Sequence, residues 1–393
     1  MSLPPFAELG VPARAVTALA ARGIVTPTPI QARTLPDALA GLDVCGRAPT
    51  GSGKTIAFGI PLVLGVDRAS PHRPRGLVLV PTRELAAQVR AELVALAGRR
   101  GPRVEAVYGG VGFERQRKAL RAGVEILVAC PGRLADLLGR GHLELSEVRT
   151  VVVDEADRMA DMGFLPEVRR LLDRCPADRQ TLLFSATLDG EVDVLVSRYQ
   201  RDPVRHEVDA AEPAHGAVEH HFWSVEPTER VRTAAAVIER IGPTVVFCRT
   251  RRGADRVARQ LARAGVPATA MHGDQSQPAR ERALAAFHSG RVAALVATDV
   301  AARGIHVDDV AGVVHFDPPA DHKAYVHRSG RTARAGNHGV VVSLVVPDLR
   351  TPVRQLQREL GYEIGFDPVD LQVLDGVPPA GTAAAPRSVG HGR

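Results

Sequence analysis

Short apolar segments alternate with helix-forming segments along almost the whole chain of 393 residues. Short continuous apolar strands between helices are typical of a parallel sheet that is covered on both faces. The expected strands are residues 76–80, 125–129, 150–153 and 180–184 in the first half, and 220–225, 244–248, 268–271, 293–298, 312–316 and 339–346 in the second. The pattern therefore predicts an α/β fold with two tandem doubly wound parallel-sheet domains.

The alternation lapses between residues 202 and 216, where Pro203, Pro213 and Gly216 lie among polar residues. Such a stretch predicts a short linker. We therefore expect an N-terminal domain over residues 1–205 and a C-terminal domain over residues 217–365. Residues 366–393 are rich in Pro, Gly and Ala, and a disordered tail is expected there.

A glycine-rich segment follows the apolar stretch at residues 42–45. It reads Ala48-Pro49-Thr50-Gly51-Ser52-Gly53-Lys54-Thr55, a variant of the phosphate loop G-x-x-x-x-G-K-[ST] with Ala in the first position. In such a loop the backbone N–H groups turn toward a phosphate, and the next helix presents its positive N-terminal end. We expect Lys54 to reach the β- and γ-phosphates and Thr55 to bind Mg²⁺, with Thr50, Gly51, Ser52 and Gly53 also contacting nucleotide.

Three acidic residues, Asp154, Glu155 and Asp157, follow the expected strand at residues 150–153. Carboxylates this close together are common in solvated surface turns, but open α/β sheets bind ligands at the carboxyl ends of their strands. Because a phosphate loop lies upstream, we expect Asp154 to hold Mg²⁺ and Glu155 to deprotonate the attacking water. The two segments together predict hydrolysis of ATP.

The chain carries a net charge of +6, and only three of its basic residues are lysines. Arginine binds phosphate through two parallel hydrogen bonds, so a polyanionic partner is expected, although a GC-rich genome also favours arginine over lysine. No apolar run approaches the ~18 residues of a membrane span, and no secretory leader is recognised. The four cysteines lie far apart and are expected to be reduced. A cytoplasmic protein with no membrane association is therefore expected.

The segment at residues 325–334 is the most strongly charged part of the second half, with Arg328, Arg331 and Arg334 three residues apart. One helix would carry these arginines on roughly one face. That face is either simply solvated, or it supplies arginine fingers to the γ-phosphate, which raise the rate by ~10³–10⁵. Fingers would make hydrolysis depend on closure of the two domains, so that ATP and a second ligand promote each other's binding.

These segments, in this order and spacing, resemble the motifs of the DEAD-box RNA helicases, superfamily 2 proteins with two RecA-like domains. The resemblance runs from about Phe6 to about Pro347. It implies RNA-stimulated hydrolysis of ATP, with Mg²⁺ as cofactor, coupled to domain closure and to local unwinding of short RNA duplexes.

The resemblance also implies roles for individual residues. Gln31 matches the residue that reads the adenine edge, and Phe6 matches the aromatic that stacks on the base. Ser185 and Thr187 match the motif that couples hydrolysis to strand separation, with an expected hydrogen bond to Asp157. The remaining matches are Asp299 for nucleotide binding, His327 for coupling, Arg331 and Arg334 for the fingers, and Thr82, Arg83, Gly110, Arg133, Thr250, Gly273, Arg280 and Thr298 for RNA.

Glycines at strand or helix ends, such as Gly110 and Gly273, can bring backbone N–H groups to phosphates in contacts that are independent of base sequence. Aromatic residues make up only 4% of the chain, so recognition is expected to depend on backbone shape and 2′-hydroxyls. The choice of RNA over DNA rests on the resemblance.

Four positions depart from the family pattern: Arg47, Cys130 in place of Thr, His306 in place of Asp, and Ala333 in place of Gly. A thiol is a poor donor, so Cys130 weakens one expected phosphate contact, and His306 puts the coupling in doubt. Two alternatives therefore stay open, namely an RNA clamp or scaffold with an uncoupled ATPase, and a DNA helicase or translocase. We expect a monomer that works within ribosome-assembly or RNA-decay complexes.

Overall fold

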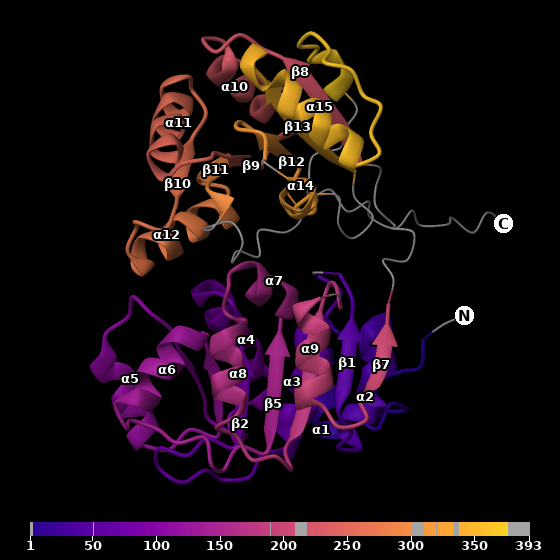
Figure 1. The fold of residues 1–393 in the computed structure, drawn as a ribbon, viewed down its shortest axis with the longest axis vertical. Coiled ribbons are helices and arrows are strands. Elements are labelled where there is room, and N and C mark those ends of the chain that lie inside the picture. The colour runs from indigo at the N-terminus through magenta and orange to yellow at the C-terminus, as the bar shows by residue number, and fades with distance from the viewer. Residues whose placement is uncertain are drawn as a thin grey trace, which may run out of the picture. The chain divides into compact units, whose positions relative to one another are not determined.

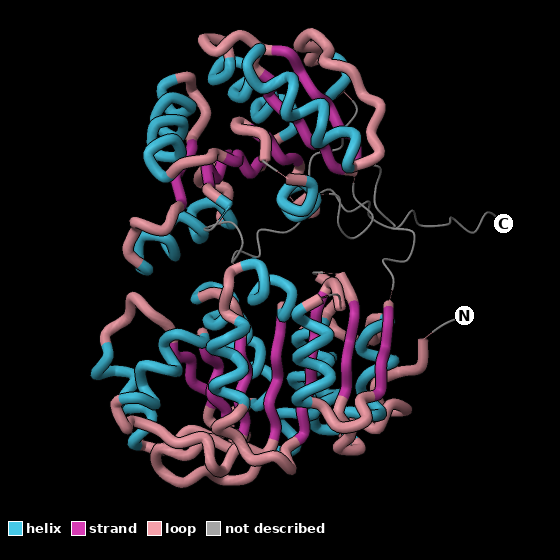
Figure 2. Tube along the Cα trace, in the orientation of Figure 1, coloured by secondary structure: helices cyan, strands magenta, loops and turns pink. Residues whose placement is uncertain are grey.

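The computed structural model describes residues 3–49, 51–188, 190–208, 218–299, 310–319, 321–332 and 338–375. The chain divides into two compact units, Met1–Ala211 (unit 1) and Glu212–Arg393 (unit 2). Each unit is a parallel sheet with helices on both faces, as Figures 1 and 2 show. The predicted fold class is therefore confirmed.

Unit 1 contains a seven-stranded sheet in the order β3-β4-β2-β5-β6-β1-β7, and every neighbouring pair is parallel. Its central strands are buried on both faces, because their Val, Ile and Leu side chains meet helices on each side. The strands are β1 Val44–Arg47, β2 Gly76–Leu79, β3 Val104–Val107, β4 Ile126–Ala129, β5 Thr150–Asp154, β6 Gln180–Ser185 and β7 Val204–Glu207.

The helices of unit 1 cover the sheet in two layers. Helices α6 to α9 pack on one face through one hydrophobic cluster, and α2, α3 and α4 pack on the other face through a second cluster. The helices are α1 Ala13–Ala20, α2 Pro29–Leu39, α3 Lys54–Gly65, α4 Arg83–Ala97, α5 Phe113–Arg121, α6 Pro131–Gly139, α7 Ala156–Asp161, α8 Leu165–Leu172 and α9 Glu191–Tyr199.

Unit 2 repeats this plan with a six-stranded parallel sheet in the order β10-β11-β9-β12-β13-β8. Its strands are β8 Val218–Ser224, β9 Thr244–Phe247, β10 Ala268–Met271, β11 Ala294–Ala297, β12 Gly312–His315 and β13 Gly339–Val345. One face packs against α10 Arg230–Ile241 and α11 Arg251–Arg263, together with the short η2 Gln372–Leu374. The other face packs against α12 Gln277–His288, α14 His322–Ser329 and α15 Arg350–Glu359, which follows η1 Pro347–Leu349.

Two expectations about the chain outside the cores are corrected. Residues 204–207, expected to lie at the start of the linker, form the edge strand β7 beside β1. This strand alternates half-buried and exposed positions, so it lacks the continuous apolar run that marked the predicted strands. Strand β3, at the opposite edge, was not predicted either, because Glu105 interrupts its apolar residues. Residues 366–375, expected in the tail, pack on unit 2: Leu374 is 2% exposed, and Asp367 bonds to both Ser224 and Phe222 through the backbone. Residues 376–393 lie outside the described residues.

Within the described ranges, no helix combines the length and the apolar character needed to cross a membrane.

Candidate functional site

The phosphate loop joins β1 to α3 at the carboxyl edge of the unit 1 sheet. Gly51 and Gly53 have φ values of 84° and 90°, in the left-handed region that favours glycine. Gly53 is the N-cap of the 12-residue α3 and offers no capping side chain. The N–H groups of the first helical turn are therefore available for an anion such as a phosphate. Thr50 lies outside the described residues.

Lys54 is buried, with 7% of its surface exposed, and its Nζ donates to the carbonyl of Ala48 at 2.9 Å. It forms no ion pair with a described residue. A buried ammonium with only a neutral partner is poorly compensated, so a nearby phosphate oxygen would stabilise it. Thr55, one residue further along the helix, is half-buried. These residues fit a nucleoside triphosphate.

Gln31, on α2, supports the phosphate loop through hydrogen bonds of its side-chain amide. Its Nε2 donates to the carbonyl of Gly53 at 3.0 Å, and its Oε1 accepts from the N–H of Thr28 at 2.9 Å. Thr28 in turn donates its hydroxyl to the carbonyl of Ser52 at 2.7 Å. Gln31 is only 1% exposed, so its amide serves the loop and does not face outward to a base. The expected contact with the adenine edge stays a prediction, and one N–H of the amide is already used by Gly53.

Phe6 is also buried rather than presented to a ligand. It is 1% exposed and belongs to a hydrophobic cluster with Leu9, Leu19, Leu35 and Ile60. A ring that stacks on a base needs one open face. In this structure the ring packs the N-terminal segment onto α1, α2 and α3, and its stacking on adenine stays a prediction.

The acidic segment begins at the end of β5, where Asp154 is 3% exposed. Glu155 is the N-cap of α7 and adopts a left-handed backbone, with φ 51° and ψ 50°. Its N–H donates to Asp154 Oδ1 at 3.0 Å, and its own Oε2 accepts from Arg158 Nη1 at 2.7 Å. Both Glu155 and Arg158 are buried, with 6% and 9% exposed. Sequence reasoning missed Arg158, although its i,i+3 spacing from Glu155 is a signal for this ion pair.

Ser185 connects the phosphate loop with the acidic segment. Its carbonyl accepts from the N–H of Ala48 at 3.0 Å, and its Oγ accepts from the N–H of Asp157 at 3.1 Å. The expected bond between Ser185 and Asp157 is thus present. It runs from the backbone N–H of Asp157 to the Ser185 hydroxyl and does not involve the Asp157 carboxylate. Thr187, two residues further on, is exposed.

The four expected RNA contacts of unit 1 lie at the ends of β2, β3 and β4. The guanidinium of Arg83 lies so close to Gly110 that an added Cβ would collide with it, and Gly110 has a φ of 82°. Arg133 Nη1 donates to Gln116 Oε1 at 3.1 Å. Thr82 caps α4 by accepting from Leu85 at 3.4 Å. Gln116, which sequence reasoning missed, links this group to β3 by donating to the carbonyl of Tyr108 at 3.0 Å.

The departures from the family pattern have local consequences where the structure describes them. Cys130 is the N-cap of α6 and makes no side-chain capping bond. Burial raises the pKa of its thiol to about 12, so the group stays protonated and unreactive. Arg47 pairs with Glu207 at 2.7 Å across β1 and β7. His306 and Ala333 lie outside the described residues.

In unit 2, Asp299 is already paired. Arg328 donates to its two carboxylate oxygens at 2.6 and 2.7 Å, and to the carbonyl of Asp317 at 2.8 Å. Arg328 is 4% exposed, whereas the side chain of Asp299 is 31% exposed, so solvent reaches the pair from the carboxylate. The expected role of Asp299 in nucleotide binding therefore requires an oxygen atom that also serves Arg328.

The expected basic helix face is wrong. Helix α14 ends at Ser329 with Gly330 as its C-cap, so Arg331 lies beyond the helix. Arg331 is 7% exposed, and its carbonyl accepts from Val310 at 3.4 Å. Arg334 lies outside the described residues. His327, in the last turn of α14, is exposed.

The expected RNA contacts of unit 2 follow the ends of its strands. Thr250, after β9, caps α11 by accepting from Gly253 at 3.0 Å. Gly273, after β10, lies beside Arg251, which pairs with Asp274 at 2.5 Å. Thr298, after β11, is 6% exposed, and Arg280 on α12 is 7% exposed. Among the residues that the structure describes, no three His, Cys, Asp or Glu side chains form a cluster able to hold a metal by themselves.

Known protein families match both units of the chain. Residues 28–195 match the DEAD/DEAH box helicase family, and residues 229–336 match the helicase conserved C-terminal domain. The chain is 39% identical over 355 residues to the ATP-dependent RNA helicase CshA of Limosilactobacillus reuteri, a match that covers 90% of this chain and 71% of that protein. It is 41% identical over 344 residues to the DEAD-box ATP-dependent RNA helicase CshA of Geobacillus kaustophilus, covering 87% and 73%.

Among solved structures, S. cerevisiae Dbp5 bound to RNA and ADP BeF3 is similar, with a TM-score of 0.81 and 26% identity. That match covers 95% of this chain and 99% of the other. The chain therefore belongs to the DEAD-box family of ATP-dependent RNA helicases.

Proposed function

We propose that this protein hydrolyses ATP when RNA is bound, and uses the cycle to separate short RNA duplexes locally. The observation that carries the proposal is the double role of Ser185. Its carbonyl holds Ala48 at the phosphate loop, and its hydroxyl holds Asp157 next to the acidic segment. Nucleotide binding at the loop and activation of water at the carboxylates are therefore mechanically linked through one residue.

The phosphate loop binds the triphosphate in this proposal. The N–H groups at the start of α3 and the ammonium of Lys54 neutralise phosphate oxygens, after Lys54 exchanges its bond to Ala48. Thr55 and Asp154 would hold Mg²⁺, which supplies charge neutralisation between the phosphates. Gln31 keeps the loop in shape through Gly53.

Glu155 acts as the general base that orients and deprotonates the attacking water. Arg158 holds this carboxylate in one orientation, because the pair is buried and the atoms are 2.7 Å apart. Arg158 is therefore a positioning residue in this proposal.

The two units are proposed to work by closure. Residues 1–205 bind ATP, residues 217–365 supply Arg331 and Arg334 as fingers, and RNA spans the contacts at Arg83, Arg133, Thr250 and Arg280. The closed state keeps one strand bent and excludes its partner, and release of phosphate reopens the protein. We place this activity in the cytoplasm, in a monomeric protein that acts within larger RNA-processing complexes.

The test is the Glu155→Gln variant of the full chain. An amide keeps an acceptor for Arg158 but cannot take a proton, so ATP and RNA should still bind while kcat falls by ~10²–10⁴. Steady-state phosphate release with and without RNA measures this, and near-normal release would remove Glu155 from the role of base. Stimulation by single-stranded RNA but not by DNA, together with displacement of a short RNA duplex, would separate the helicase from a DNA translocase and from an RNA clamp.

A further inference from the structure

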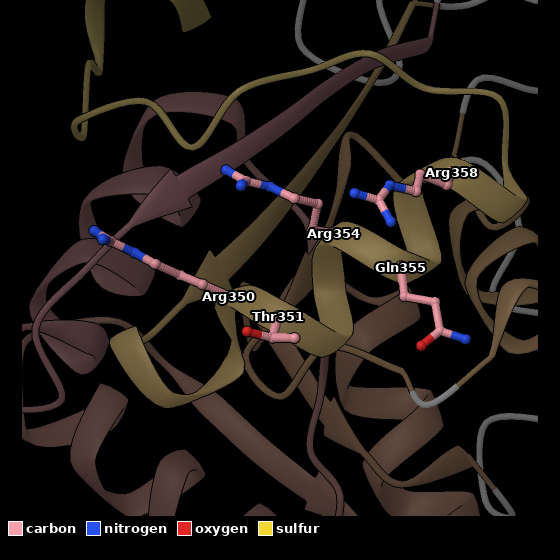
Figure 3. A pocket seen from close by; sticks show the side chains of 5 residues that line it. All are labelled: Arg350, Thr351, Arg354, Gln355 and Arg358. Carbon is pink, nitrogen blue, oxygen red and sulfur yellow. The ribbon is translucent and has the colours of Figure 1, made fainter.

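A hollow of about 480 Å³ lies on the outward face of α15, and all the side chains that line it are polar. Figure 3 shows its lining residues, which are Arg350, Thr351, Arg354, Gln355 and Arg358. All five are exposed, whereas Val353 and Leu356 on the inward face are buried in the core of unit 2. The helix is thus anchored by one face, and its other face is available to a ligand.

Three arginines follow one another at single-turn spacing along this face. Arg350, Arg354 and Arg358 are four residues apart, which places them about 6 Å apart along the helix axis. None of the three forms an ion pair with a described residue. Arg350 Nη2 donates to Ser224 Oγ at 2.6 Å, and the guanidinium of Arg354 lies 5.3 Å from the ring centre of Phe366. These neutral contacts hold the side chains in place without cancelling their charge.

The acidic group nearest in the helix does not neutralise the row. Glu359 accepts from Gln355 Nε2 at 3.2 Å, and its other oxygen lies 3.5 Å from His322 Nδ1. The carboxylate is therefore bonded to Gln355, which also lines the hollow, and lies near His322, but it forms no ion pair with any of the three arginines. The arginine face keeps a surplus of positive charge and attracts an anion.

We propose that this arginine face binds consecutive phosphates of an RNA strand, as a contact additional to the helicase motifs. Guanidinium groups bind phosphate with two parallel hydrogen bonds, and their spacing here is comparable with that of successive phosphates in a strand. The lining has arginines but no Trp or Tyr, the aromatic anchors that are enriched beside arginine at protein–protein interfaces. The proposal rests on the RNA-binding function proposed above and extends it to a second surface.

The position of α15 predicts how the contact depends on the length of the bound RNA. The helix packs near β8 and β13, at one edge of the unit 2 sheet, through Val353 and Leu356. Gly273 and Arg280 follow β10, the strand at the opposite edge. A short strand bound at the motifs is therefore not expected to reach α15, and a longer strand is.

The test compares two variants of the full chain with equal loss of charge. One carries Arg350→Gln, Arg354→Gln and Arg358→Gln. The matched control carries Arg259→Gln, Arg263→Gln and Arg291→Gln, three exposed arginines of the same unit at the C-terminal half of α11 and before β11. Binding of oligouridine strands of about 10 and about 40 nucleotides is measured by fluorescence anisotropy over a series of salt concentrations.

On the long strand, the α15 variant should bind about 10- to 100-fold more weakly than wild type at ~0.1 M salt. Its slope of log K against log [salt] should be smaller by about 2, since each lost phosphate contact removes about 0.7. On the short strand, binding and RNA-stimulated ATPase should match wild type. The control should keep the wild-type slope on both strands.

Equal losses in the α15 variant and the control would overturn the proposal, because they would show an effect of net charge alone. A loss of the same size on the short strand would also overturn it, by placing α15 within the main site. Unchanged binding of the long strand by the α15 variant would likewise overturn the proposal, because the arginines would then make no contact with RNA. Failure of the wild-type protein to bind any RNA would instead refute the proposed function, so the two failures are distinguishable.

Discussion

The helix that follows β1 in unit 1 and the helix that follows β9 in unit 2 begin in different ways. Helix α3 starts at Gly53 with no capping side chain, whereas α11 starts at Thr250, whose hydroxyl accepts from the N–H of Gly253 at 3.0 Å. Helix α14 in unit 2 is also capped, by Asp321 at 2.8 Å. The first-turn N–H groups are thus left for a ligand at α3 and are partly occupied by side chains at α11 and α14.

The charged groups at the carboxyl ends of the strands also differ between the units, because those of unit 2 are paired with opposite charges and Lys54 of unit 1 is not paired with one among the described residues. Lys54 in unit 1 is buried with a neutral carbonyl as its partner. In unit 2, Arg328 is paired with Asp299, and Arg230 is paired with Asp317 at 2.7 Å. Two units with one fold therefore present one edge prepared for an anion and one edge satisfied internally. Fold alone does not specify a nucleotide site; the local caps and charges do.

The largest expected effect comes from removing the guanidinium group that unit 2 is proposed to supply to the nucleotide site of unit 1. Arg331→Ala in the full chain should lower RNA-stimulated kcat by ~10³–10⁵ and leave the Kd for ATP almost unchanged, because a finger acts on the transition state. Steady-state ATPase and nucleotide-binding titrations measure the two quantities. Arg263→Ala, at an exposed position, is the control. Near-normal kcat in a folded Arg331→Ala protein would mean that unit 1 catalyses without unit 2.

A second prediction separates the units by their response to acid. Burial, and then the charge of His221, lower the pKa of His220 from 6.5 to about 4, and burial also lowers that of His315. In the unfolded chain both take up protons below about pH 6.5, so acidification favours unfolding of unit 2 between pH 6.5 and 4. The loss should reach about 3 kcal/mol for His220. His220 Nδ1 is bonded to the hydroxyl of Tyr325 on α14 at 2.8 Å, so protonation of His220 is expected to disturb its contact with α14.

Unit 1 should respond at lower pH. Burial raises the pKa of Glu125, but hydrogen bonds from Arg103 outweigh it and lower the value from 4.5 to about 2. This stabilisation is present above pH 4.5 and is lost as the pH falls toward 2. Trp223, the single tryptophan of the chain, is buried in unit 2, so its fluorescence follows that unit. Unfolding of unit 1 is measured separately, by hydrogen exchange of its peptides.

A tryptophan transition that does not change between pH 7 and 4.5 would contradict this difference between the units. The control variant His220→Asn does not titrate at this position, so the loss of stability in acid should shrink to the part that His315 contributes.

A third prediction concerns the support of the phosphate loop. Gln31→Ala removes two hydrogen bonds, to Gly53 and Thr28, and should raise the KM for ATP by about 10-fold. Because the amide is buried and serves the loop, KM for GTP should rise by the same factor. Loss of ATP binding alone would restore a role for Gln31 in reading adenine. Gln200→Ala, which removes bonds to Val44 and Thr181, should lower stability without changing KM.

The smallest effect tests the caps themselves. Cys130→Thr should add the capping bond that α6 lacks and raise the free energy of unfolding of unit 1 by about 0.5–1 kcal/mol. The reverse change, Thr250→Cys, should lower that of unit 2 by a similar amount. Denaturant unfolding measures both. No gain in the first variant, with the expected loss in the second, would show that α6 cannot form the capping geometry.

Much of the fold and of the nucleotide site was open to sequence reasoning, because the information is local. Buried parallel strands need continuous apolar segments, and a phosphate loop needs its glycines, lysine and hydroxyl at set spacing. Strands β2, β5 and β10 were predicted almost to the residue for that reason. Strands β3 and β7, at the two edges of the unit 1 sheet, were missed, since neither is a continuous apolar segment.

Tertiary structure decided which polar groups are occupied. The sequence by itself determined two parallel-sheet units, the phosphate loop and the carboxylates that end β5. Only the packed chain showed that Gln31 supports Gly53, that Phe6 is enclosed, that Arg158 holds Glu155, and that α14 stops before Arg331. Hydrogen-bond partners and burial depend on contacts between segments far apart in sequence, and residue spacing does not encode those contacts.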